Sequence, residues 1–205
     1  MNMIFGRSYW DIISGVYDVF ERLYNRKCYD GTGARTAQEI ESGDRVLECA
    51  CGTGAISVHL AGRCRTLRAT DFSVNMLRRA AKKCRSFGNI RFCRADICDL
   101  DCRDGYFDKV VAGNVIHLLD EPYMAVDELL RVCKKGGKVI IPTYLNVGKK
   151  SSELLIKIFN FAGANFTKQF TYDSYKKFFA DGGYENVTFD LVEGRMPCAL
   201  AIITK

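Results

Sequence analysis

The spacing of apolar residues changes along the chain, from a helical period near the start to short apolar runs further on. Large apolar side chains recur at steps of three and four residues between Trp10 and Tyr24, which predicts a helix with a broad apolar face. Beyond Ile40, short apolar runs that predict strands alternate with helical patterns. The predicted strands are Arg45–Ala50, Thr66–Asp71, Ile90–Asp96, Phe107–Gly113, Val139–Tyr144, Val187–Val192 and Ala199–Thr204.

The helical patterns between these strands carry start and stop signals. Ser73 is suited to cap the helix after the second strand. Pro122 lies in the first turn of the helix before the fifth strand, and the run Lys134–Gly137 predicts where that helix ends. The other helices are expected from Ala55 to Leu60, over Ser152–Ala162 and over Tyr172–Asp181.

Strands that alternate with helices predict an α/β fold, a doubly wound sheet of seven strands with helices on both faces. Most of these strands should be parallel. The last two are joined by the short turn Glu193–Pro197, so they must form an antiparallel hairpin. Only three prolines and no low-complexity linker interrupt the pattern, which predicts a single domain over residues 1–205.

The amino-acid composition is that of a folded globular protein. Hydrophobic residues make up 48% and charged residues 26% of the 205 residues, which excludes disordered and collagen-like chains. No run of 18 apolar residues predicts a transmembrane helix. The first residues lack the basic region, apolar run and cleavage site of a secretory leader. We therefore expect a cytoplasmic protein.

Ten cysteines are the unusual feature of this composition. No CxxC pair occurs among them, and closed zinc sites normally use such short hooks. Most of them lie inside apolar runs such as VLECAC and LLRVCKK, where a free cysteine packs as a small apolar side chain. We predict reduced cysteines that pack in the core and no metal site; redox chemistry stays open as the alternative.

Positive charge is concentrated in one part of the chain. The net charge is +6, and residues from Arg63 to Arg94 include ten Lys or Arg against the single acid Asp71. Such a basic patch could bind nucleic acid, anionic lipid or an acidic substrate. It could equally be the solvated outer face of one helix and two strands. No RNA-binding signature accompanies it.

Three acidic residues stand at the ends of successive predicted strands. Glu48, Asp71 and Asp96 lie at or near the ends of the first, second and third strands. In a doubly wound sheet, ligands bind beyond the carboxyl ends of the strands. Between the first strand and its helix, the glycines of the loop Ala50–Gly54 would let a ligand approach the backbone closely. Taken singly, each acid could also cap a helix or stabilise a turn.

The nature of these residues distinguishes between two kinds of nucleotide. A dinucleotide site would have GxGxxG, whereas the loop here reads GTGAIS. Glu48 would repel a pyrophosphate but attract an ammonium group. Asp71 is suited to accept both hydroxyls of a ribose, and Asp96 could accept a hydrogen bond from the adenine amine. Together they point to S-adenosylmethionine rather than NAD.

The same residues resemble a known family. The run VLECACGTGAIS is similar to the motif (D/E)xGxGxG of class I S-adenosylmethionine-dependent methyltransferases. ATDFSVNML, CRADICDL, GYFDKVVAGNVIHLL and KKGGKVIIPTY resemble the later motifs in the same order. The resemblance covers about residues 40 to 145. SYWDIISGVYDVFERLY resembles the lid helix of the ubiquinone/menaquinone-type (methyltransferase type 11) and phospholipid N-methyltransferase branch.

This resemblance implies a Rossmann-like fold with a helical lid at 1–40, a cofactor-binding core at 41–145, and acceptor-side helices with the hairpin at 146–205. It implies S-adenosyl-L-methionine as cofactor and S-adenosyl-L-homocysteine as product. His117 is the candidate general base. The cofactor-binding residues it implies are Tyr17, Glu48, Ala50, Cys51, Gly52, Gly54, Asp71, Phe72, Met76, Asp96, Ile97, Asn114 and Ile116.

One residue departs from the family motif. Ala50 stands where the motif has its first glycine. The additional methyl group should be tolerated, with some loss of affinity if this position requires a positive φ.

The expected reaction is in-line methyl transfer to a small, partly apolar acceptor. Tyr144 is a further pocket candidate, and the oligomeric state, monomer or homodimer, is left open. The alternatives are an RNA methyltransferase that uses the basic patch and a non-catalytic protein that binds S-adenosylmethionine. The aromatic residues expected to shape the acceptor pocket are Phe159, Phe161, Phe166, Phe170 and Tyr172.

Overall fold

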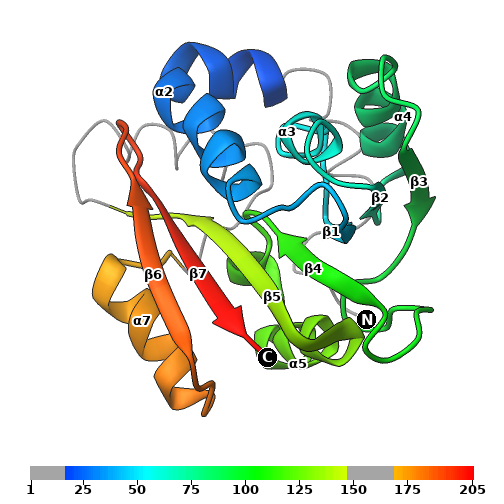
Figure 1. Cartoon of the computed structure of the whole chain (residues 1–205). Coiled ribbons are helices and arrows are strands. Elements are labelled where there is room, and N and C mark those ends of the chain that lie inside the picture. The colour runs from blue at the N-terminus through cyan, green and yellow to red at the C-terminus, as the bar shows by residue number, and fades with distance from the viewer. Residues whose placement is uncertain (1–16, 147–168) are drawn as a thin grey trace.

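A seven-stranded sheet organises the chain (Figure 1). The computed structural model describes residues 17–146 and 169–205, with side chains from residue 25 onward. The strand order is β3-β2-β1-β4-β5-β7-β6. The strands β3, β2, β1, β4 and β5 run parallel, whereas β7 is antiparallel to both β5 and β6. The strands are β1 Arg45–Cys49, β2 Thr66–Asp71, β3 Ile90–Arg94, β4 Phe107–Ala112, β5 Cys133–Tyr144, β6 Val187–Val192 and β7 Cys198–Thr204.

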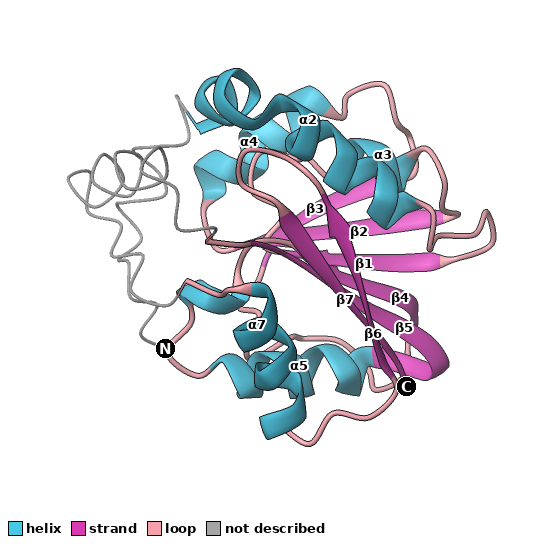
Figure 2. Cartoon of the chain, turned by 90° about the vertical axis from the view of Figure 1, so that its left-hand side faces the viewer, coloured by secondary structure: helices cyan, strands magenta, loops and turns pink. Residues whose placement is uncertain are grey.

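Helices cover both faces of this sheet, as Figure 2 shows. α2 (Tyr17–Ala37), α3 (Ser57–Ala61) and α4 (Val74–Lys83) lie on one face, and α5 (Pro122–Val132) and α7 (Tyr172–Asp181) lie on the other. A 3-10 turn, η1 (Ile116–Leu118), follows β4. Each face buries its own apolar cluster. The predicted doubly wound, Rossmann-like sheet with its antiparallel C-terminal hairpin is confirmed.

Local signals explain most of the helix starts. The Ser73 hydroxyl accepts a hydrogen bond from the Met76 amide at the start of α4. Pro122 occupies the first turn of α5, where its missing N–H costs nothing. At α7, Thr171 and Ser174 form a reciprocal capping box.

The predicted end of α5 is wrong by several residues. The helix ends at Val132, and the run Lys134–Gly137 lies inside β5. The register along β4 shifts there, since Phe107 pairs with Cys133 but Lys109 pairs with Lys138. A basic, glycine-rich run that normally ends a helix is therefore accommodated as an irregularity in a strand.

α2 extends further than the apolar pattern indicated. It is kinked at Asn25, whose φ of −134° and ψ of 36° are non-helical, and continues to Ala37. A Cβ atom on Gly31 would lie 2.9 Å from Val192 Cγ1, and one on Gly33 would lie 2.2 Å from His59 Cδ2. These glycines, which lower helix propensity, let α2 lie close against β6 and α3.

The cysteines are free thiols, and seven of the ten are buried. Burial raises the pKa of Cys64, Cys84 and Cys133 to about 11. These thiols are therefore protonated at neutral pH, as expected of packing residues. Among the helices of residues 17–146 and 169–205, none is both long and apolar enough to cross a membrane.

The close packing of α2 predicts an unusual response to a helix-favouring substitution. Gly33→Ala should lower the free energy of unfolding by about 1–3 kcal/mol, because the new methyl group meets the His59 ring. Gly43→Ala is the control, since a Cβ there meets nothing within 4 Å. Denaturant unfolding measures both variants. Helix propensity alone predicts that Gly33→Ala stabilises the protein. That result would show that close contact with His59 does not require glycine at this position.

Candidate functional site

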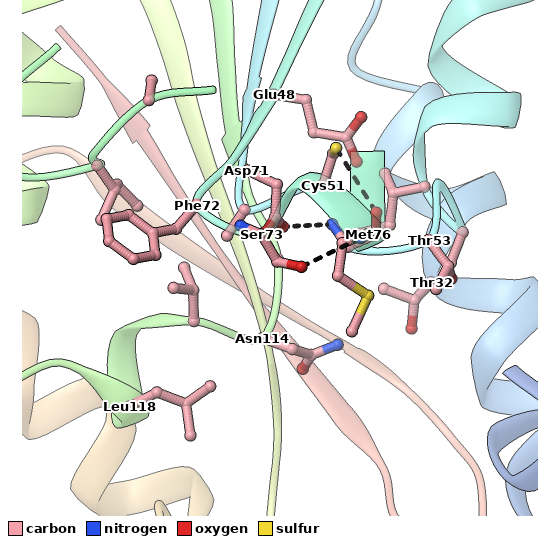
Figure 3. Close-up of a pocket in the computed structure, with 18 of the residues that line it drawn as sticks. Thr32, Glu48, Cys51, Thr53, Asp71, Phe72, Ser73, Met76, Asn114 and Leu118 are labelled. Carbon is pink, nitrogen blue, oxygen red and sulfur yellow. Dashed lines mark hydrogen bonds between the residues drawn. The ribbon is translucent and has the colours of Figure 1, made fainter. Parts of the chain in front are cut away.

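A cleft lies beyond the carboxyl ends of the central strands, on either side of the junction between β1 and β4. The strand order reverses at this junction, which is where doubly wound sheets bind ligands. The cleft is open to solvent, and the empty space within it and at its mouth amounts to about 1090 Å³. In Figure 3, Phe72 and Leu118 lie on one side of it and Thr32 and Thr53 on the other. The lining residues are Tyr29, Thr32, Glu48, Ala50, Cys51, Gly52, Thr53, Ala55, Ile56, Asp71, Phe72, Ser73, Met76, Ala95, Asp96, Ile97, Gly113, Asn114, Val115, Leu118 and Tyr144.

Glu48 is the most deeply buried acid of the lining. Its side chain accepts a hydrogen bond of 2.5 Å from the Ser57 hydroxyl, and the residue is only 2% exposed. Burial raises the pKa of Glu48 most, the hydrogen bonds from Ser57 oppose the shift, and the nearby Asp71 carboxylate adds to it; the resulting pKa is about 8. A protonated Glu48 at neutral pH would become a carboxylate when a cation approaches it.

The loop after β1 adopts an unusual backbone conformation. Ala50, Gly52 and Gly54 all have positive φ, at 52°, 53° and 83°. A Cβ on Gly52 would meet nothing within 4 Å, whereas one on Gly54 would lie 3.1 Å from Ala80 Cα. Gly52 therefore keeps the backbone accessible from the cleft, and Gly54 allows the loop to pack on α4.

Asp71 holds this loop in place at the end of β2. Its Oδ2 accepts a hydrogen bond of 2.8 Å from the Gly52 amide, and its Oδ1 accepts one of 2.8 Å from the Ser73 amide. Each carboxylate oxygen has a second lone pair, and Asp71 lines the cleft. Asp71 can therefore stabilise the turn and also bind a ligand, the two roles that the sequence left open.

The next strand end supplies the neighbouring wall. Asp96 Oδ1 accepts a hydrogen bond from the Cys98 amide at 3.0 Å, which fixes the turn that carries Ile97. Phe72 is held by Arg94, whose Nε donates to the Phe72 carbonyl at 3.1 Å and whose guanidinium lies 4.8 Å from the centre of the ring. Asp96 and Phe72 both line the cleft, and each is held by a contact within the chain.

Asn114 occupies the opposite wall, directly after β4. Its φ is 54°, a conformation that asparagine tolerates better than most residues. Its backbone N–H donates to the Pro142 carbonyl at 2.7 Å, and its side-chain Oδ1 accepts a hydrogen bond from the Tyr144 backbone N–H at 2.9 Å. The side chain is thus oriented by β5, and Tyr144 is brought into the lining.

Known proteins share this sequence and this architecture. Residues 47–141 match the family model described as a methyltransferase domain. The chain is 37% identical over 135 residues to a demethylmenaquinone methyltransferase of Clavibacter sepedonicus, covering 64% of this chain and 55% of that protein. It is 40% identical over 137 residues to a phosphatidylethanolamine N-methyltransferase of Cereibacter sphaeroides, covering 60% of this chain and 67% of that protein. This chain belongs to the S-adenosylmethionine-dependent methyltransferases.

Solved structures share the fold of this chain. A S-adenosylmethionine-dependent methyltransferase from Aquifex aeolicus superposes with a TM-score of 0.70 at 18% identity, covering 98% of this chain and all of that one. The chain spans little more than half the length of the demethylmenaquinone methyltransferase it matches.

The lining of the cleft fits the cofactor of the family. It includes three acids, Glu48, Asp71 and Asp96, and none of the described lining residues is Lys, Arg or His. S-adenosylmethionine carries a sulfonium and an ammonium group, so an acidic lining complements its charge. A pyrophosphate would be repelled by the same residues.

Three predicted site residues, Gly54, Ile116 and His117, do not line the cleft. Gly54 packs against α4, and Ile116 is fully buried in the core. His117 belongs to the same 3-10 turn as Ile116 and is not in the lining. Burial lowers the pKa of His117 to about 4, so its imidazole is neutral. Tyr17 begins α2, but its side chain lies outside the described side chains.

Of the aromatic residues expected to shape the acceptor pocket, the structure describes only Phe170 and Tyr172. Phe159, Phe161 and Phe166 lie outside the described residues. The Phe170 ring centre lies 5.2 Å from that of Tyr175 and 5.5 Å from that of Phe178. Phe170 and its neighbour Tyr172 pack against the core cluster beneath α7, so these two residues stabilise the helix instead of lining the cleft.

Sequence reasoning missed the contribution of the second half of α2. Tyr29 and Thr32 line the cleft. Both lie within the predicted helical lid of residues 1–40, but Tyr17 was the residue of that lid predicted to contact the cofactor. Gly31 and Gly33 flank Thr32, and they make this segment resemble a loop in sequence. The glycines are needed because α2 approaches β6 and α3 closely at this point. That contact is visible only in the folded structure, so the sequence alone could not show that the helix continues to Thr32.

The conformation of Ala50 predicts a stabilising substitution. Ala50→Gly should raise the free energy of unfolding by about 0.5–1 kcal/mol, because the strain of a left-handed alanine exceeds the entropic cost of glycine. Ala55→Gly, at a position without positive φ in the same segment, should lower it instead. Denaturant unfolding distinguishes the two. Destabilisation by both substitutions would refute the strain at Ala50.

The raised pKa of Glu48 predicts a pH-dependent stability. Because the folded protein keeps this proton up to about pH 8 while the unfolded chain loses it near 4.5, rising pH favours unfolding in that interval, by at most about 1.4 kcal/mol per pH unit. Glu48→Gln should remove this loss, so its stability advantage over the natural protein should grow from about pH 5 to about pH 8. Glu193→Gln, at an exposed residue, is the control. A Glu48→Gln advantage that does not change with pH would contradict the assignment.

Proposed function

We propose that the protein transfers the methyl group of S-adenosylmethionine to a small, partly apolar acceptor and releases S-adenosylhomocysteine. The observation that carries this proposal is the set of three acids at successive strand ends, grouped around a loop with left-handed backbone conformations. A cationic, adenosine-bearing ligand is complementary to that set. Family membership supplies the reaction class.

The cofactor would lie across the carboxyl ends of β1, β2 and β3. We assign Glu48 and the backbone of Ala50, Cys51 and Gly52 to the methionine part of the cofactor. We assign the ribose hydroxyls to the Asp71 carboxylate, because each carboxylate oxygen can accept more than one hydrogen bond. Phe72 and Met76 would pack on the nucleoside, Asp96 and Ile97 would meet the adenine edge, and Asn114 would lie near the sulfonium.

Alignment is the main task of this chain during the reaction. The bound cofactor supplies an electrophilic methyl group, so the protein must orient the acceptor and exclude water. Asn114, fixed by the Tyr144 amide, provides a rigid polar edge. Val115 and Leu118 provide apolar surface beside it. His117 lies outside the lining, so we assign it no proton transfer.

The acceptor is proposed from the relatives and from the wall beside β4 and β5. The two relatives are named for demethylmenaquinone and phosphatidylethanolamine as acceptors. An acceptor of this partly apolar class suits the surface formed by Val115, Leu118 and Tyr144. Such a molecule would enter the cleft on the side away from Asp71 and Asp96.

The basic patch supports an RNA acceptor less well. Arg68 donates to Cys102 Sγ at 3.2 Å, Arg94 holds Phe72, and Lys83 donates to Tyr29 and Thr53. These three cations make contacts within the chain. The patch also borders β2, β3 and α4, on the proposed cofactor half of the molecule.

Calorimetry with S-adenosylhomocysteine tests the cofactor assignment. The natural protein should bind it, and Asp71→Asn should weaken binding roughly 10- to 100-fold, because charge-assisted hydrogen bonds to the ribose are lost. Asp101→Asn, at an exposed acid, should bind as the natural protein does. NAD binding as tight as that of S-adenosylhomocysteine would contradict the proposal.

Transfer of a labelled methyl group identifies the acceptor class. The protein is incubated with labelled S-adenosylmethionine and, separately, a demethylated quinone, vesicles of phosphatidylethanolamine, or bulk RNA. We expect label in one of the partly apolar acceptors. Label in RNA alone would overturn the proposed acceptor and favour the RNA methyltransferase.

A further inference from the structure

The acidic lining leaves one group of the cofactor without a partner. The amino-acid end of S-adenosylmethionine carries a carboxylate as well as an ammonium group. Asp71 and Asp96 would repel that carboxylate, and none of the described lining residues is cationic. A ligand with both charges therefore needs a source of positive potential at one end of the cleft.

Lys83 stands directly behind the wall of the cleft at such an end. This residue closes α4, and its Nζ donates to the Tyr29 hydroxyl at 3.1 Å and to Thr53 Oγ1 at 3.2 Å. The ammonium group also lies 5.9 Å from the centre of the Tyr29 ring. Tyr29 comes from α2 and Thr53 from the loop after β1, and both line the cleft.

The burial of this cluster strengthens its electrostatic effect. Thr53 is only 2% exposed, and Lys83 is half-buried, whereas its neighbour Lys82 is exposed. A partly desolvated charge is screened less by salt and water than a surface charge. A hydroxyl that accepts from an ammonium group becomes a better donor toward an anion. Lys83 can therefore act through Tyr29 and Thr53 without entering the cleft.

We infer that Lys83 is a positioning residue that directs the carboxylate of the cofactor's methionine part to the hydroxyls of Tyr29 and Thr53. This inference rests on the proposed function. The ammonium of the same group would face Glu48, so the two opposite charges fix the direction of the amino-acid end. The same contacts join α4, α2 and the loop after β1, so Lys83 also sets the position of α2 over the cleft.

A pair of ligands that differ only in the carboxylate tests this inference. Calorimetry compares S-adenosylhomocysteine with its decarboxylated analogue, S-adenosyl-3-thiopropylamine. Lys83→Met should weaken S-adenosylhomocysteine about tenfold and should change binding of the analogue less than about twofold. Lys82→Met, which removes the adjacent exposed charge, should leave both affinities unchanged.

Two further variants separate positioning from a merely structural effect. Tyr29→Phe keeps the ring but removes the hydroxyl, and it should also weaken only S-adenosylhomocysteine. Lys83→Arg keeps the charge and should restore part of the preference for the carboxylate. Equal weakening of both ligands by Lys83→Met, or no weakening of either, would overturn the inference. Failure of the natural protein to bind S-adenosylhomocysteine would instead overturn the proposed function.

Discussion

The hydrogen bond from the Gly52 amide to the Asp71 carboxylate is the contact on which the site depends. It joins the loop after β1 to the end of β2 over 2.8 Å, and so holds a segment in which three residues have positive φ. A left-handed conformation is costly at Ala50 but readily adopted by the two glycines, so at Ala50 it persists because neighbouring contacts fix it. Asp71 thereby shapes the loop that it would share with the cofactor.

Burial and charge in the cleft then follow from this arrangement. The loop covers Glu48, whose carboxyl is fixed by Ser57 and desolvated. The cleft is lined by three acids, one of which is protonated because it is buried, and this lining favours a cationic ligand. The positive charge of Lys83 lies just outside the lining, next to Thr53. The family relationship and the local electrostatics therefore point to the same cofactor by independent reasoning.

Much of this could be predicted from the sequence, because the relevant signals are local. β2 and β6 were predicted with the bounds they have, since each is a short run bounded by turn residues, and Glu48, Asp71 and Asp96 could be placed because parallel strands end at one edge of a sheet. Other features depend on tertiary contacts. Tyr29 lines the cleft only because α2 continues through two glycines that its docking requires, and Lys83 is distinguished from neighbouring surface charges only by its contacts.

A crystal structure with S-adenosylhomocysteine bound would show directly which residues hold each part of the cofactor. We expect both ribose hydroxyls within hydrogen-bond distance of Asp71 and the adenine amine beside Asp96. It also predicts the amino-acid carboxylate at the hydroxyls of Tyr29 and Thr53. A ligand bound elsewhere, or one whose ribose makes no contact with Asp71, would contradict it.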